Sequence, residues 1–243
     1  MSKTEFFDLC KRSFCENGLE RCLSDDTLNK LFSLCEIFLE TNKKMNLSAI
    51  RDEKLVVSRH FADCLLSAGN FPFGTSVLDV GSGGGMPALP LAIARPDLKI
   101  TALDATRKKT AFIEKAAQLL DLSNISVLTG RAEELARTPL RESFDCVTAR
   151  AVAELRTLLE ICVPFAKPNG RFVAMKGKNA EVELASAATA MKKMKCSVLP
   201  YEKEILRDPD GETSERYTLV FVKNAKTDAI YPRKYAQIVK DPL

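Results

Sequence analysis

The fold of this chain is decided by the stretch Val77-Leu78-Asp79-Val80-Gly81-Ser82-Gly83-Gly84-Gly85-Met86-Pro87. An apolar run typical of a buried strand leads into four closely spaced glycines, and Pro87 stands where the first residue of a helix is expected. Glycine allows the backbone to turn sharply between strand and helix and to approach a ligand closely. The stretch therefore predicts a strand, a ligand-binding turn and a helix, in that order.

Outward from this turn, strand-like and helix-like segments alternate along the chain. Short apolar runs predict strands at residues 76–80, 99–103, 126–128, 146–148 and 172–175. Helical patterns separate them, at residues 87–94, 108–120, 133–136 and 152–165. Such an alternation is typical of an α/β fold in which helices cover both faces of a mostly parallel, doubly wound sheet of the Rossmann type.

The two ends of the chain depart from this alternation. After a helix expected over residues 180–194, apolar runs at 196–205 and 217–222 flank a turn sequence, which predicts an antiparallel edge hairpin and seven strands in total. Residues 1–70 show helical spacing instead, and Gly69-Asn70-Phe71-Pro72-Phe73-Gly74 marks a boundary. We expect a helical N-terminal extension, residues 1–74, that packs on a Rossmann-like domain, residues 75–243.

The composition of the 243 residues is that of an ordinary globular protein, with 46% hydrophobic and 28% charged residues. No apolar run approaches the roughly 20 residues of a membrane span, and the N-terminus lacks a signal-peptide core, so we expect a cytoplasmic chain without membrane contact. The net charge of +4 arises in residues 151–243, which hold 16 basic and 12 acidic residues. This excess suits either a phosphate-bearing partner or a solvated surface.

Eight cysteines and a single histidine, His60, limit the chemistry open to the chain. No two cysteines have the C-x-x-C spacing of a zinc site, so we expect no metal. Hydrolysis of the Ser-His-Asp type would have to depend on His60 itself. Most cysteines fall at apolar positions, which predicts small core residues rather than disulfides or reactive thiols.

The spacing of the glycines selects among the ligands that such a turn can bind. A dinucleotide-binding turn requires G-x-G-x-x-G, but Met86 takes the last position, and the lysine of a Walker loop is absent. The pattern Asp79-x-Gly81-x-Gly83-x-Gly85 instead resembles the first motif of the Rossmann-like methyltransferases that use S-adenosylmethionine. These four residues are therefore candidate cofactor contacts.

Later strands end in residues that fit the same cofactor. Asp104 ends the second predicted strand about 20 residues beyond the glycines, where a carboxylate can bind ribose hydroxyls. Ala132 and Glu133 follow the third strand, where a backbone N–H and a carboxylate can bind the adenine edge. Either acid alone could simply complement a helix N-terminus. The three motifs in register favour S-adenosyl-L-methionine as the cofactor.

Further motifs narrow the resemblance to one family. They are Asn42-Lys43-Lys44-Met45-Asn46-Leu47-Ser48, Arg59-His60-Phe61-Ala62-Asp63-Cys64-Leu65, Thr148-Ala149-Arg150-Ala151, Lys176-Gly177, Ser214-Glu215-Arg216-Tyr217 and Tyr231-Pro232-Arg233-Lys234. With the glycine turn, they resemble the family of glucose-inhibited division protein B, also called ribosomal RNA small subunit methyltransferase G. Met86 departs from the usual Phe or Leu, and Ala88 from the usual Gly.

The resemblance implies an enzyme that transfers a methyl group from S-adenosylmethionine to N7 of one guanine in 16S ribosomal RNA. It implies cofactor contacts at Gly81, Met86, Ala132, Glu133 and Arg150. The partner would be 16S ribosomal RNA or a small-subunit particle, and we expect a monomer. The alternatives are a methyltransferase for another RNA or a small molecule, and a non-catalytic RNA-binding module.

The residues around the fourth predicted strand fit methylation at N7. The run from Phe144 to Arg150 lacks the proline pair of an adenine-N6 enzyme, and Cys146 lies inside the strand rather than at the place of a nucleophile. Because the N7 lone pair is available at neutral pH, alignment with the methyl group suffices and no base is required.

Arg150, just beyond the fourth strand, is the candidate catalytic residue, because a guanidinium there can hold the cofactor carboxylate or a phosphate. The alternative is a structural ion pair with Asp104 or Glu154. The candidate RNA contacts are Asn46, Arg59, His60, Lys176, Lys178 and Arg216. For His60 the alternative is a partner at Asp63 on the same helix, and for the cations it is a solvated surface position.

Overall fold

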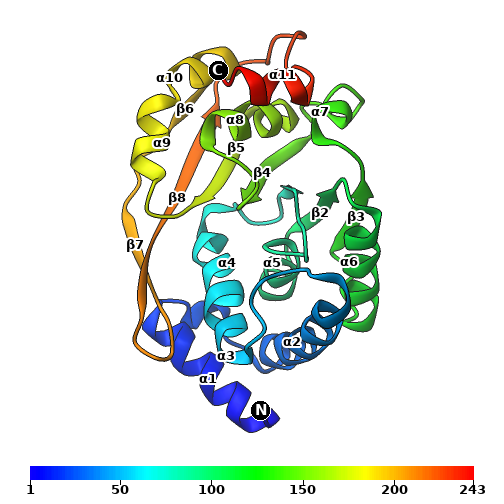
Figure 1. Cartoon of the computed structure of the whole chain (residues 1–243), viewed down its shortest axis with the longest axis vertical. Helices are drawn as coiled ribbons and strands as arrows, with labels where there is room; N and C mark the ends of the chain where they lie inside the picture. Colours follow the sequence, from blue (N-terminus) through cyan, green and yellow to red (C-terminus); the bar gives the residue numbers. More distant parts are fainter.

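The computed structural model describes all 243 residues and contains one eight-stranded sheet (Figure 1). The strands lie across the sheet in the order β3-β2-β1-β4-β5-β8-β6, and β7 also pairs with β8. Their bounds are β1 Ser76–Val80, β2 Lys99–Asp104, β3 Ile125–Thr129, β4 Phe144–Arg150, β5 Ala166–Lys176, β6 Cys196–Val198, β7 Lys203–Arg207 and β8 Thr213–Lys223. The predicted α/β class and the mostly parallel sheet with an antiparallel edge are confirmed.

The strand order reverses between β1 and β4, which are parallel neighbours. Because successive residues of a strand point to opposite faces, Val77 and its partner Cys146 enter one hydrophobic cluster, while Leu78 and Val147 enter the other. From the carboxyl end of β1 the chain continues to β2 on one side of this pair, and from the carboxyl end of β4 it continues to β5 on the other side. In doubly wound sheets ligands bind in the crevice at such a reversal of the strand order.

Helices cover both faces of the sheet. The first cluster includes residues of α5 (Ala88–Ala94) and α6 (Arg107–Leu119). The second cluster includes residues from α8 (Leu155–Cys162), the 3-10 turn η4 (Val163–Phe165), α9 (Ala180–Ser186), α10 (Ala188–Met194) and α11 (Tyr235–Lys240), and α7 (Ala132–Leu135) packs on it.

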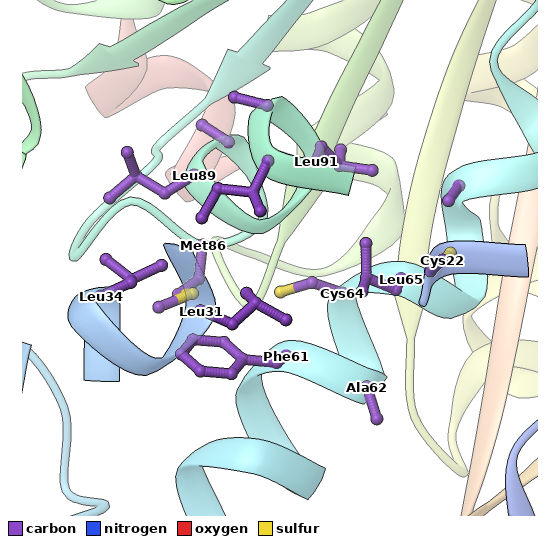
Figure 2. Packing of buried hydrophobic residues seen from close by; sticks show 14 of the residues in the cluster. Cys22, Leu31, Leu34, Phe61, Ala62, Cys64, Leu65, Met86, Leu89 and Leu91 are labelled. Atoms are coloured by element: carbon purple, nitrogen blue, oxygen red, sulfur yellow. The ribbon is translucent and has the colours of Figure 1, made fainter. Parts of the chain in front are cut away.

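The helical N-terminal segment packs on the first face. Its elements are α1 Lys3–Glu16, η1 Glu20–Cys22, α2 Asp25–Met45, α3 Glu53–Val56, η2 Val57–Ala62, α4 Asp63–Leu66 and η3 Ser67–Asn70. Ser24 caps α2 by accepting a hydrogen bond from the Thr27 N–H at 3.1 Å. Figure 2 shows Leu31 and Phe61 of this segment close to Met86 and Leu89, and all four residues belong to the first cluster. The segment and the sheet therefore share one hydrophobic core.

Two details of the predicted elements were wrong. The run 196–205 is two short strands, β6 and β7, so the sheet has eight strands rather than seven. Pro200 lies between them and has no N–H to donate to β8, which interrupts the pairing. The helix expected over 180–194 is divided into α9 and α10 at Ala187, whose side chain is fully buried.

The end of the chain is held to the body by arginine contacts. Arg141 donates to the carbonyl oxygens of Thr227, Asp228 and Tyr231, and the Arg233 guanidinium pairs with the fully buried Glu160 at 2.7 Å. All eight cysteines are free and all except Cys15 are buried, which confirms their predicted place in the core. None of the helices combines the length and the apolar character that crossing a membrane requires.

Substitution Leu31→Ala tests the shared core. Leu31 is fully buried against residues of the sheet body, so we expect its truncation to lower the free energy of unfolding by about 3 kcal/mol. We also expect one cooperative transition in urea, monitored by circular dichroism. A loss below about 1 kcal/mol, or a separate unfolding step for residues 1–74, would contradict the shared core.

Candidate active site

The glycine turn between β1 and α5 is fixed by the neighbouring strand. The N–H groups of Gly81 and Ser82 both donate to the carbonyl oxygen of Leu103, at 2.7 and 2.9 Å. Gly81, Gly83 and Gly85 have φ values of +74°, +54° and +82°. Because side chains are strained in this left-handed region, the alternating glycines of the motif have a conformational cause.

The space around these glycines distinguishes their roles. A Cβ atom on Gly85 would lie 2.4 Å from Leu89 Cδ1, and one on Gly81 would lie 2.6 Å from Val152 Cγ2. A Cβ on Gly83 would meet nothing nearer than the carbonyl oxygen of Gly81, at 3.9 Å. Packing therefore requires glycine at positions 81 and 85, whereas Gly83 faces open space that a ligand can enter.

Asp79 is a buried carboxylate with one unused oxygen. Its Oδ2 accepts the Ala88 N–H at 3.3 Å, while Oδ1 is buried without a hydrogen-bond partner. Burial raises the pKa of Asp79 to about 7. An ammonium group would satisfy this oxygen and favour its charged form. The methionine part of S-adenosylmethionine carries such a group, so the residues present fit this cofactor.

Asp104, at the end of β2, is joined to the turn. Its Oδ2 accepts the Gly83 N–H at 2.9 Å and its Oδ1 accepts the Thr106 N–H at 2.8 Å. Each carboxylate oxygen has a further lone pair, so Asp104 can still accept hydrogen bonds from ribose hydroxyls. The open space at Gly83 and the acceptor at Asp104 therefore lie together.

The other candidate cofactor contacts lie on both sides of this turn. Ala132 and Glu133 are half-buried in the first turn of α7, where a carboxylate also complements the helix N-terminus. Met86 is 7% exposed, and its side chain packs in the cluster with the N-terminal helices (Figure 2). Its burial in this cluster explains why an apolar residue is needed there.

A cleft of about 500 Å³ opens at the carboxyl ends of β4 and β5. It brings together Arg150 and five of the six candidate RNA contacts, namely Arg59, His60, Lys176, Lys178 and Arg216. The sixth, Asn46, is the exposed residue that ends α2, and it accepts a hydrogen bond from Arg51 at 3.1 Å outside the cleft. A larger groove of about 970 Å³ between α1, α2 and α3 contains none of the candidate residues.

Arg150 reaches from the end of β4 into the N-terminal segment. Its Nη1 donates to Asp63 Oδ2 at 2.6 Å and to the carbonyl oxygen of Arg59 at 3.1 Å. Its Nη2 donates to His60 Nδ1 at 2.8 Å. The alternative ion pairs expected with Asp104 or Glu154 are wrong, because the partner carboxylate comes from α4.

His60 is neutral in this arrangement. Since an arginine can only donate, His60 Nδ1 must accept, and the ring proton on Nε2 is donated to Ser48 Oγ at 2.9 Å. Burial, together with the charge of Arg150, lowers the pKa of His60 to about 3. The alternative of a hydrogen bond between His60 and Asp63 is wrong, because Asp63 binds two arginines instead.

The remaining cations of the cleft differ in how many of their charges are paired with acidic groups of the protein. Arg59 pairs with Asp208 and Glu212, each at 2.6 Å. Lys176 is mostly buried and bonded to Glu183 at 2.6 Å and to the carbonyl oxygen of Ala153 at 3.0 Å. Lys178 is exposed and has no such partner. The cleft therefore offers a solvent-facing cation at Lys178 and partly engaged guanidinium groups at Arg59, Arg150 and Arg216.

Three residues of the site were not proposed as functional from the sequence. Asp63 stands one turn after His60 in the same motif, and that spacing was a usable signal. Ser48 lies in the motif of residues 42–48, where Asn42 holds its backbone N–H and carbonyl at 2.9 Å each. Glu183, which binds Lys176, lies in α9 without any local signal.

Comparison with known proteins places this site in a family. A family model described as rRNA small subunit methyltransferase G matches residues 27–207. Ribosomal RNA small subunit methyltransferase G from Clostridium perfringens strain 13 is 36% identical, over 98% of this chain and 99% of its own length. The chain belongs to the rRNA small subunit methyltransferase G family. The protein of that name from Exiguobacterium sibiricum is 40% identical, over 94% of this chain and 95% of its own.

Solved structures agree with the family at the level of the fold. The YcgJ protein from Bacillus subtilis has a TM-score of 0.52 at 16% identity, covering 68% of this chain and 100% of that chain. TYW2 from M. jannaschii, solved in complex with AdoMet, has a TM-score of 0.53 at 14% identity and covers 67% of this chain and 77% of that chain.

Family membership confirms the resemblance read from the motifs. The chain is an enzyme, a methyltransferase of ribosomal RNA that uses S-adenosylmethionine as its cofactor. The assignment of individual cofactor and RNA contacts stays a prediction, supported by the arrangement of the turn and the cleft.

Substitution Asp79→Asn tests the burial of the carboxylate. The folded protein holds the proton of the Asp79 carboxyl group more tightly than the unfolded chain does. Protonated Asp79 therefore contributes its full stabilisation below about pH 4, and this contribution is lost as the pH rises to about 7. We expect the variant to gain stability relative to the wild type between these values, by up to about 4 kcal/mol in urea unfolding. A stability difference that is the same at pH 4.5 and pH 8 would contradict this.

Substitution Gly83→Leu tests the open space at the turn. The new side chain would enter that space, and we expect it to weaken S-adenosylmethionine binding by at least about 100-fold in calorimetric titration, while the positive φ costs stability by about 1–2 kcal/mol. Gly74→Leu is the matched control, since Gly74 has a φ of +74° and open surroundings in a distant loop. Normal binding by Gly83→Leu would remove the turn from the cofactor site.

Proposed function

We propose that this enzyme transfers the methyl group of S-adenosylmethionine to N7 of a guanine in the 16S RNA of the small ribosomal subunit, acting in the cytoplasm as a monomer. The membership of the family supports the RNA class. The finer choice of atom is supported by the protonation and bonding of the groups that line the cleft.

Every group of the cleft that could act as a base is already engaged. His60 accepts from Arg150 and donates to Ser48, and its pKa is lowered to about 3. The Asp63 carboxylate binds Arg150 and Arg216, and Glu183 binds Lys176. A methyl acceptor that must lose a proton would find no free base among the residues that line the cleft, and Asp79, which does not line it, would be occupied by the ammonium of the cofactor. This observation favours guanine N7, whose lone pair is available at neutral pH.

The residues of the site then act by binding and orientation. When bound, S-adenosylmethionine supplies an electrophilic methyl group for in-line transfer to the N7 lone pair. Asp79 would hold the ammonium of its methionine part and Asp104 its ribose hydroxyls. Arg150 would hold its carboxylate or a neighbouring phosphate of the RNA, because three of the five N–H donors of this guanidinium have protein partners and two remain.

The RNA would reach the cleft as an unpaired segment, because a base must leave its stack to enter a pocket. Lys178, Arg216 and Arg59 are the cations placed to contact its phosphates. We further propose that residues 1–74 form an extension of the methyltransferase domain, residues 75–243, that supplies one wall of this cleft.

The proposal is tested by mapping 7-methylguanosine in 16S ribosomal RNA by mass spectrometry, in cells with and without the gene for this chain. We expect one modified guanine to disappear without the gene and to return with the wild-type chain. The Gly83→Leu variant should fail to restore it, and Gly74→Leu should succeed. An unchanged map, or the loss of a different modified nucleotide, would refute the proposed target atom.

A further inference from the structure

The carboxylate of Asp63 joins two arginines that come from β4 and β8, the two strands on either side of β5. Its Oδ2 accepts from Arg150 Nη1 at 2.6 Å, at the end of β4, and its Oδ1 accepts from Arg216 Nε at 2.5 Å, in β8. The Asp63 side chain is 11% exposed, so these contacts are largely shielded from solvent. Each oxygen is thus used by a different guanidinium.

The backbone before Asp63 explains how its side chain faces the cleft. Residues 57–62 form a π-helical turn, and the Asp63 N–H donates to the carbonyl oxygen of Ser58, five residues earlier. The wider turn changes the angle at which successive residues project, compared with an α-helix. His60 and Asp63 therefore both meet Arg150, and α4 lies below the end of β4 (Figure 1).

All the partners of Arg150 come from residues 59–63, so this short segment sets the direction of its guanidinium. Because His60 is neutral, Asp63 supplies the only negative charge among them. The two guanidinium groups and the one carboxylate that join directly here carry a net charge of +1 among themselves. That charge suits one anionic group of a ligand, such as a carboxylate or a phosphate diester.

Resting on the proposed function, we propose that Asp63 is a positioning residue that holds Arg150 and Arg216 in the directions needed to bind the cofactor and the RNA. Without its charge, the two guanidinium groups would repel each other across a poorly solvated gap. Each would then turn toward solvent or toward another acceptor. Asp63 itself need not touch the cofactor or the RNA.

Asp63→Asn is the direct test, because it keeps the size of the side chain and removes its charge. The matched control is Asp97→Asn, which breaks an ion pair with Arg95 at 2.7 Å, of similar exposure, at the opposite end of β2 from Asp104. On the purified full chain we would measure the melting temperature, the Kd for S-adenosylmethionine by calorimetry, and kcat and KM for methyl transfer to small-subunit RNA.

We expect both variants to lose similar thermal stability. Asp63→Asn should raise the Kd for S-adenosylmethionine at least fivefold and lower kcat at least tenfold, whereas Asp97→Asn should change both less than twofold. A merely structural role for Asp63 would lower the melting temperature and leave the Kd and kcat of the folded protein unchanged. A Kd and kcat within twofold of the wild type would overturn the proposal.

Asp63→Glu decides the matter if Asp63→Asn does not fold. It keeps the charge but displaces the carboxylate by one methylene, so we expect a folded enzyme whose kcat and cofactor Kd are each impaired about threefold. Wild-type values in Asp63→Glu would overturn the proposal. If the wild-type chain does not methylate 16S RNA, the proposed function fails, yet the cofactor Kd of these variants still decides the role of Asp63.

Discussion

The geometry of the site depends on the two hydrogen bonds that the carbonyl oxygen of Leu103 accepts from the glycine turn. They anchor the turn after β1 to the end of β2, so the shape of the turn depends on the register in which the two strands pair. The next residue along β2 is Asp104, whose carboxylate binds the Gly83 N–H. One pair of parallel strands therefore places the backbone turn, the open space above it and the acidic group together.

The other part of the site, around Arg150, depends mainly on contacts between side chains. Arg150 leaves the end of β4, but its direction is set by Asp63, His60 and the carbonyl of Arg59, none of which belongs to the sheet. The helices before the sheet are therefore part of the active site as well as of the core. The family model, which matches residues 27–207, includes this segment as well as the sheet.

The sequence was sufficient for features with a local cause. The strand ending at Asp79, the alternating glycines and the acidic end of β2 each follow from chain geometry over a few residues, and so does the hairpin around residues 208–211. The pairing of Arg150 with Asp63 spans 87 positions and links two motifs, so no local pattern could give it. The π-helical turn was hidden for another reason, since its apolar spacing looks like that of an ordinary helix. The division of residues 196–205 could have been read from Pro200.

That proline has a consequence at the outer margin of the sheet. An exposed strand edge carries unpaired N–H and C=O groups and can recruit a strand from another molecule. Here the edge beside β8 consists of two short strands, β6 with three residues and β7 with five, which are separated by Pro200, and Lys203 begins β7. A foreign strand would find too few consecutive backbone groups to pair with, and a lysine charge beside them. The break that shortens the ladder therefore also protects the folded chain from growing into aggregates along this side.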